Sequence, residues 1–119
     1  MYKIPADIEK ELKDFFAQYS FIDKVVVFGS RARGDNAKKS DIDICIYSLE
    51  MSDSEFRDLR YELNELPILY HIDIVHFEKI NDELRENILK DGKLFFVPMI
   101  KQKDDDFNNY ENMVRVSYE

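Results

Sequence analysis

The stretch FGSRARGDNAKKSDIDICIY, residues 28–47, decides the fold, because parts of two strands flank a polar turn within it. A β-branched and aromatic run over residues 24–28 predicts a buried strand that ends at a glycine. Residues 41–47 alternate, with isoleucines on one face and Asp41 and Asp43 on the other. This period of two predicts a second strand, which we expect to pair with the first in one sheet.

Hydrophobic periodicity and capping residues predict the other elements around this centre. We expect helices at residues 6–19, from near Ser30, from Ser52 or Ser54 to about residue 66, and at 81–90, and strands at 71–77 and 94–97. These elements form one domain over residues 1–100. Residues 101–119 form a C-terminal tail, interpreted as a loop, a disordered segment or a partner-docking segment. Within it, Met113, Val114, Val116 and Tyr118 would form a small strand or a docking segment.

The composition limits the classes of function. The chain has 119 residues, 45% of them hydrophobic, which suits one domain with one core. A net charge of -8 disfavours direct binding to nucleic acid, although metal ions can offset negative charge locally. A single cysteine fits a reducing cytosol, and no apolar run approaches the length of a membrane span. We therefore expect a cytoplasmic protein without a signal peptide or a membrane segment.

Three carboxylates lie in strands that are otherwise apolar. Asp41 and Asp43 share a strand face at about 6–7 Å along the chain. Asp73 lies in a later strand between isoleucines, so all three converge if that strand lies beside the second. Such close carboxylates repel and raise one another's pKa, and two divalent ions would relieve this repulsion. Magnesium prefers hard oxygen ligands of this kind.

Gly29 and Ser30 lie between the first strand and a short helix. Glycine allows close backbone approach to a phosphate, and a helix N-terminus offers N–H donors. Arg31 or Arg33 is expected to contact a triphosphate, and Ser40 either caps the following loop or touches phosphate. A phosphate cradle beside a carboxylate cluster indicates nucleoside triphosphate chemistry.

Other chemically capable residues have a simpler interpretation. His71 and His76 bracket the third strand, and we expect them to flank it or be partly buried rather than to act in catalysis. Cys45 has no neighbouring base in the sequence, which favours core packing. Asp104, Asp105 and Asp106 form a solvated charge run.

The motif from Phe28 through Gly34 to Ile44 resembles the minimal nucleotidyltransferases of the DNA polymerase β-like superfamily. Their signature is Gly-Ser, about ten residues, Asp-x-Asp and a third carboxylate on a later strand. The short chain and the Ser-x-Ala-Arg-Gly form look most like the MNT antitoxins that pair with HEPN ribonuclease toxins. The resemblance covers about residues 8–97 and implies an α/β (α+β) fold, a mixed sheet flanked by helices as in the polymerase β palm.

The resemblance also implies a function. ATP would donate AMP to a tyrosine of a HEPN toxin, using two Mg²⁺ ions, in a hetero-oligomer with that toxin. Asp41, Asp43 and Asp73 would bind metal, and Asp73 would help to deprotonate the attacking hydroxyl. The phosphates would be held by Gly29, Ser30, Arg33 and Ser40.

Two alternatives remain open at this level. The chain would neutralise its toxin mainly as a stoichiometric binding module, or it would act on a small molecule or an RNA end. Relatives of the second kind carry extra domains that hold the acceptor, for which 119 residues leave little room. The donor base, the acceptor tyrosine, the number of nucleotides added and the stoichiometry are not fixed by the sequence.

Overall fold

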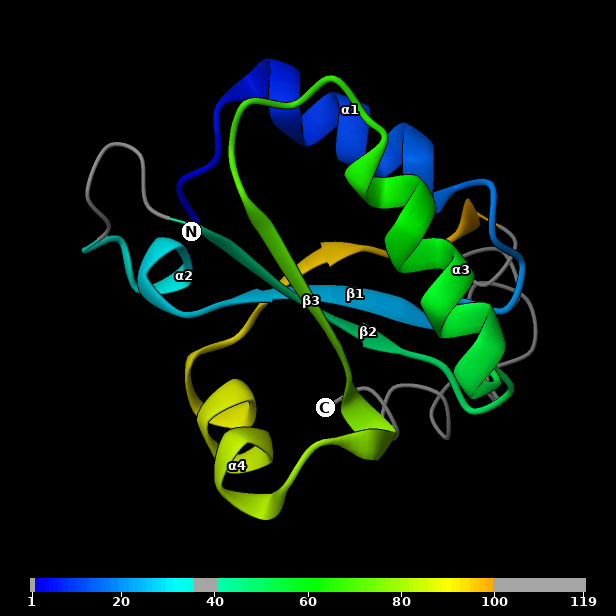
Figure 1. Ribbon diagram of the computed structural model, residues 1–119. Coiled ribbons are helices and arrows are strands. Elements are labelled where there is room, and N and C mark those ends of the chain that lie inside the picture. The colour runs from blue at the N-terminus through cyan, green and yellow to red at the C-terminus, as the bar shows by residue number, and fades with distance from the viewer. Residues whose placement is uncertain (1, 36–40, 100–119) are drawn as a thin grey trace.

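The computed structural model describes residues 2–35 and 41–99, and it places four strands of this part of the chain in one sheet (Figure 1). The elements in chain order are α1 (Ala6–Phe16), β1 (Lys24–Phe28), α2 (Ser30–Arg33), β2 (Ile42–Tyr47), α3 (Asp53–Asn64), β3 (Ile72–His76), the 3₁₀ turn η1 (Phe77–Lys79), α4 (Asp82–Asp91) and β4 (Lys93–Phe96). The strand order is β3-β2-β1-β4. Only the β2–β3 pair is parallel, so the sheet is mixed, as expected.

The sheet separates two apolar layers. Ile42, Ile44 and Ile46 of β2 are fully buried on the face that α1 and α3 cover. The opposite face of β2 carries Cys45, which packs with Ile88 of α4 in a second, smaller cluster. Figure 1 shows α1 and α3 on one side of the sheet and α4 on the other. The alternation of residues 41–47 thus assigns each side chain to a layer, which confirms the predicted strand.

The helix ends follow their capping chemistry. Ser52, rather than Ser54, caps α3, and it forms a reciprocal capping box with Glu55. Asn81 caps α4 by accepting a hydrogen bond from the Leu84 N–H at 2.8 Å. The prediction for the first helix was three residues too long. Helix α1 ends at Phe16 because tighter i→i−3 hydrogen bonds close its last turn.

Two further observations bear on the sequence predictions. Among the described helices, none has both the length and the apolar composition needed to cross a membrane. The predicted strand or docking segment within residues 101–119 lies outside the described residues.

Candidate active site

Asp43 is the centre of the site because of its position in the sheet. In the central strand β2, it lies opposite Phe28 of β1 on one side and opposite Asp73 of β3 on the other. Its side chain is half-buried, on the face of the sheet that α4 covers. The sheet pairing therefore brings Asp43 and Asp73 together although 30 residues of chain separate them.

Gly29 is required by this arrangement. It follows Phe28 directly and has φ 76°, a conformation that side-chain-bearing residues rarely adopt. A Cβ at this position would collide with the Oδ2 atom of Asp43. The backbone at Gly29 thus lies against the Asp43 carboxylate, which brings the two halves of the sequence motif into contact.

Asp41 and His71 complete the group. They directly precede β2 and β3, and the backbone N–H of Ile42 donates to the His71 carbonyl at 2.9 Å, which extends the pairing of the strands by one step. One ligand atom from each of Asp41, His71 and Asp73 lies within 4.8 Å of the others. The Nε2 atom of His71 is 3.0 Å from Oδ1 of Asp73.

The sequence prediction set His71 aside, and the structure places it among the site residues. A signal was present: His71 precedes Asp73 by two positions, as Asp41 precedes Asp43. On a strand, residues two apart share a face. His76 differs, since it is buried and its Nε2 atom lies 2.8 Å from the Ser48 carbonyl oxygen.

The electrostatics reflect the crowding of carboxylates. Burial raises the pKa of the Asp43 carboxyl above its ordinary value, and the nearby Asp73 and Asp41 charges raise it further. His71 and Arg33 act in the opposite direction, with smaller effects. The site therefore favours either a proton or a cation near Asp43.

The two arginines of the motif have different environments. Arg31 is buried, donates to the Lys3 carbonyl at 2.9 Å, and stacks over the Tyr70 ring at 4.9 Å. Arg33 is partly exposed and pairs with Asp35 at 3.2 Å and with Asp91 at 3.7 Å. Arg31 thus ties α2 to the N-terminal segment, whereas Arg33 remains on the surface beside the site.

Two of the remaining predicted residues, Ser30 and Cys45, lie where the sequence indicated. Ser30 is the first residue of α2, directly after Gly29, as the sequence indicated. Ser40 lies outside the described residues. Cys45 is fully buried and burial raises the pKa of its thiol, which suits the predicted packing role.

The donor set fits divalent cations. Three carboxylates supply hard oxygen ligands, and their mutual repulsion is the property that a divalent ion would relieve. Asp41 and Asp73 are exposed, so an ion and its nucleotide can reach them from solvent. Asp41, His71 and Asp73 each offer one ligand atom within 4.8 Å of the others, which suits a divalent ion. Asp43 is outside this group of three and lies beside it, opposite Asp73.

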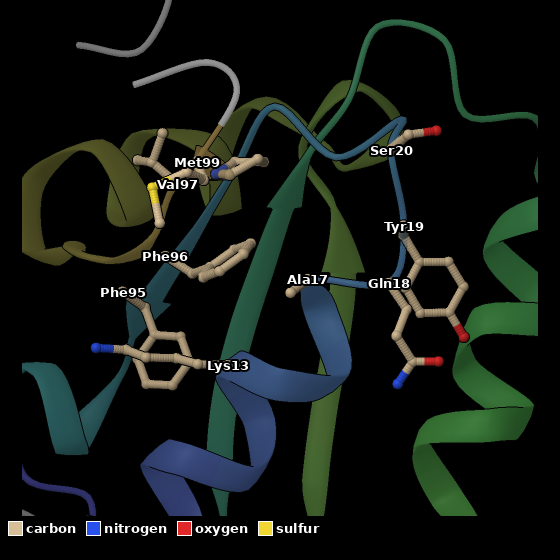
Figure 2. A pocket seen from close by; sticks show the side chains of 10 residues that line it. Lys13, Ala17, Gln18, Tyr19, Ser20, Phe95, Phe96, Val97 and Met99 are labelled. Atoms are coloured by element: carbon tan, nitrogen blue, oxygen red, sulfur yellow. The ribbon is translucent and has the colours of Figure 1, made fainter. Parts of the chain in front are cut away.

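A separate apolar pocket lies at the other end of the sheet (Figure 2). Its volume is about 600 Å³, and its walls come from the end of α1 and from the end of β4 and the residues after it. Phe96 in this wall is paired with Val25, at the opposite end of β1 from Phe28. None of the carboxylates of the site lines this pocket.

Comparison with known proteins gives one family match. The model of the family described as polymerase beta, nucleotidyltransferase, matches residues 10–99. This segment contains Gly29, Ser30 and all three site carboxylates. The comparison with curated proteins gave no match.

Solved structures with the same fold include chains of toxin–antitoxin complexes. A chain from a toxin–antitoxin structure with AMP-PNP has 17% identity and a TM-score of 0.63, and the match covers 92% of this chain and 87% of that one. A chain from tri-AMPylated Shewanella oneidensis HEPN toxin in complex with MNT antitoxin has 16% identity and a TM-score of 0.57, with 92% and 84% covered. A proposed nucleotidyltransferase from Sulfolobus solfataricus has 24% identity and a TM-score of 0.52, with 76% and 77% covered.

The contact between Gly29 and Asp43 predicts the effect of adding one methyl group. We expect Gly29→Ala to displace the Asp43 carboxylate and to reduce nucleotide transfer at least about tenfold, the cost of roughly 1.4 kcal/mol. Transfer from labelled nucleoside triphosphate would be measured. The control is Gly34→Ala: Gly34 also has a positive φ, but a Cβ there meets only Lys3 Cε at 3.8 Å. Equal transfer by the Gly29 variant and the wild type would contradict the prediction.

The raised pKa of Asp43 predicts how stability depends on pH. Because this pKa is higher in the folded than in the unfolded chain, ionisation of Asp43 destabilises the fold, increasingly so as pH rises through the folded pKa. In a chelator, Asp43→Asn should therefore melt a few degrees above the wild type at neutral pH, and this difference should shrink toward about pH 4. Thermal unfolding at several pH values measures it. Asp58→Asn, on the exposed face of α3, is the control. If the difference in melting temperature between Asp43→Asn and the wild type did not change with pH, the electrostatic cause would be refuted.

Proposed function

This chain belongs to the polymerase beta nucleotidyltransferase family, and we propose that it transfers AMP from ATP to a tyrosine of a HEPN-type ribonuclease toxin. The toxin would be its partner in a hetero-oligomeric complex, and the transfer would neutralise it. The observation that supports the chemistry is the meeting of Asp43 and Asp73 across parallel strands, with Gly29 against Asp43. Domain 1–100 would supply the enzyme, and residues 101–119 would contribute to docking.

The roles of the residues follow from their positions. Asp41 and Asp43 would hold two Mg²⁺ ions, with Asp73 sharing one of them. The ions would supply charge stabilisation for the phosphates and make the attacking hydroxyl more acidic. Asp73, which is exposed, would accept the proton of the tyrosine hydroxyl as its oxygen attacks the α-phosphorus. The bond from the α-phosphorus to the bridging oxygen would break, and pyrophosphate would leave.

The triphosphate would lie along α2. Gly29 keeps the backbone at the start of α2 against the Asp43 carboxylate, and Ser30 adds a hydroxyl at the start of the helix. Arg33 would turn from its surface pairs with Asp35 and Asp91 to the leaving phosphates. Such a charge-assisted contact would gain strength as negative charge develops on pyrophosphate. Ser40 is proposed as a further phosphate contact.

The acceptor is proposed from the comparisons. Two of the similar folds come from toxin–antitoxin complexes, one with AMP-PNP and one with a tri-AMPylated HEPN toxin. These similarities support the fold of this chain. The toxin tyrosine as acceptor is proposed by extending to this chain what those two complexes contain. Labelled AMP found on an RNA end or on a small molecule, instead of on the toxin, would redirect the proposal to those acceptors.

A transfer assay tests the proposal. Protein, its HEPN partner, Mg²⁺ and ATP labelled at the α-phosphate are incubated, and label on the partner is measured by electrophoresis and mass spectrometry. We expect labelling by the wild type and a loss of roughly 10²-fold or more with Asp41→Asn, Asp43→Asn, since removing a charge-stabilising group costs on this order. Asp58→Asn is the matched control. Undiminished labelling by the double variant would rule out the proposed site.

The apolar pocket favours a second function, that of a stoichiometric binding module. Its wall ends in Met99, whose surface is 73% exposed (Figure 2). Phe96, Val97 and Pro98 add further apolar surface. An apolar segment of the toxin is the occupant proposed here, because the pocket is remote from the carboxylates and leaves the active site open.

Neutralisation of the toxin separates the two functions. If complex formation is sufficient, inhibition of the toxin's ribonuclease activity should survive Asp41→Asn, Asp43→Asn. It should fail with Met99→Glu, because a charge in an apolar contact costs several kcal/mol at most sites. It should also fail after deletion of residues 101–119, the segment proposed to contribute to docking. The measurement is RNA cleavage together with co-purification. The opposite pattern, with neutralisation lost only in the aspartate variant, would support catalysis and refute the binding module.

A further inference from the structure

His71 differs from the other histidine in what its imidazole can reach. The chain has two histidines, and His76 is 5% exposed with its Nε2 atom 2.8 Å from the Ser48 carbonyl oxygen. The side chain of His71 is 64% exposed and directed to Asp73. His71 is therefore the histidine that is open to an ion from solvent.

The backbone fixes this imidazole beside the carboxylates. The carbonyl of His71 accepts from the Ile42 N–H at 2.9 Å, which places His71 level with Asp41 at the start of the parallel strand pair. Residues 71 and 73 share a strand face, as 41 and 43 do. Sheet pairing thus sets the backbone position of His71, one residue before β3.

The spacing of one pair of donor atoms matches that of neighbouring metal ligands. Two neighbouring ligands of an octahedral ion, each about 2.1 Å from it, lie about 3.0 Å from each other. His71 Nε2 and Asp73 Oδ1 are 3.0 Å apart, and a ligand atom of Asp41 lies within 4.8 Å of both. His71 Nε2 and Asp73 Oδ1, which share a hydrogen bond without an ion, can therefore act as neighbouring ligands, and a small shift of the exposed Asp41 carboxylate would bring a third ligand to the same ion.

We propose that His71 is a nitrogen ligand of one divalent-ion position, together with Asp41 and Asp73. This nitrogen ligand then raises the affinity of the position for a first-row transition-metal ion such as Mn²⁺ relative to its affinity for Mg²⁺. The inference rests on the proposed function, which places divalent ions at these carboxylates. Imidazole suits transition metals, whereas Mg²⁺ prefers oxygen ligands and retains its waters. Neutral His71 binds through the Nε2 lone pair and keeps its proton on Nδ1.

A structural role of His71 predicts a different outcome. If its ring only orients Asp73 by donating a hydrogen bond, then a glutamine, whose amide also donates, replaces it in part. A glutamine amide nitrogen is a poor ligand, so His71→Gln keeps the possible hydrogen bond and removes the bond from nitrogen to the metal. Because His71 is exposed and lies at a strand end, this variant should fold like the wild type.

Two measurements on the full chain test the proposal. Pulsed electron paramagnetic resonance of bound Mn²⁺ should detect coupling to an imidazole ¹⁴N nucleus in the wild type and none in His71→Gln. Calorimetric titration with Mn²⁺ and with Mg²⁺ should show that His71→Gln lowers the ratio of Mn²⁺ to Mg²⁺ affinity about tenfold or more, the loss typical of altered metal environments. Circular dichroism in a chelator confirms equal folding of the two proteins.

The outcomes separate this inference from the proposed function. Mn²⁺ binding that is lost in Asp41→Asn, Asp43→Asn but shows no ¹⁴N coupling in the wild type would overturn the role of His71 and leave the carboxylate site intact. An unchanged affinity ratio in His71→Gln would overturn it equally. Absence of any divalent-ion binding by the wild type would overturn both proposals.

Discussion

Asp43 and Asp73 lie directly opposite each other on parallel neighbouring strands, where burial of Asp43 and then the charge of Asp73 disfavour the ionised Asp43 carboxylate. Strand pairing holds them near each other regardless of their charge, because the backbone register is set by the ladder and the core. The backbone at Gly29 fills the other side of Asp43 and prevents the carboxylate from moving away in that direction. The fold thus maintains a local excess of negative charge, and a proton or a cation is what can balance it.

The apolar layers stabilise the sheet against this excess of negative charge. Ile42 and Ile44 alternate with Asp43 on β2, and Ile72 and Ile74 alternate with Asp73 on β3. All four isoleucines are buried between the sheet and the helices α1 and α3. Burial of such side chains contributes about 1.5–3 kcal/mol each, enough to keep charged neighbours in register. The alternation that builds the core is therefore also what presents the carboxylates.

The two ends of the sheet differ in chemical character. One end gathers carboxylates, an imidazole and Arg33, with polar groups that face solvent. The other end has an apolar pocket between α1 and β4. Strand β1 runs from one end to the other, with Phe28 beside Asp43 and Val25 beside Phe96 of the pocket wall. The carboxylates and the pocket are therefore separate features of the sheet.

The local pattern of the sequence was enough to predict the strands and the turn at Gly29 and Ser30, and to select Asp41, Asp43 and Asp73 as candidate metal ligands. Period-two alternation and glycine conformation act over a few residues, so they can be read without the tertiary structure. The match of the family model to residues 10–99 confirms the nucleotidyltransferase fold that this pattern indicated. The burial and the neighbours of individual side chains, in contrast, depended on contacts between distant segments.

The residue pattern alone left Arg31 and Arg33 as equal candidates, and the family resemblance selected Arg33. In the structure, Arg31 is buried against Lys3 and Tyr70, while Arg33 stays on the surface. Sequence reasoning also set His71 aside, since only the parallel pairing of β2 with β3 places His71 beside Asp41. Such pairings join residues about 30 positions apart, and their register is decided by the packing of the whole sheet.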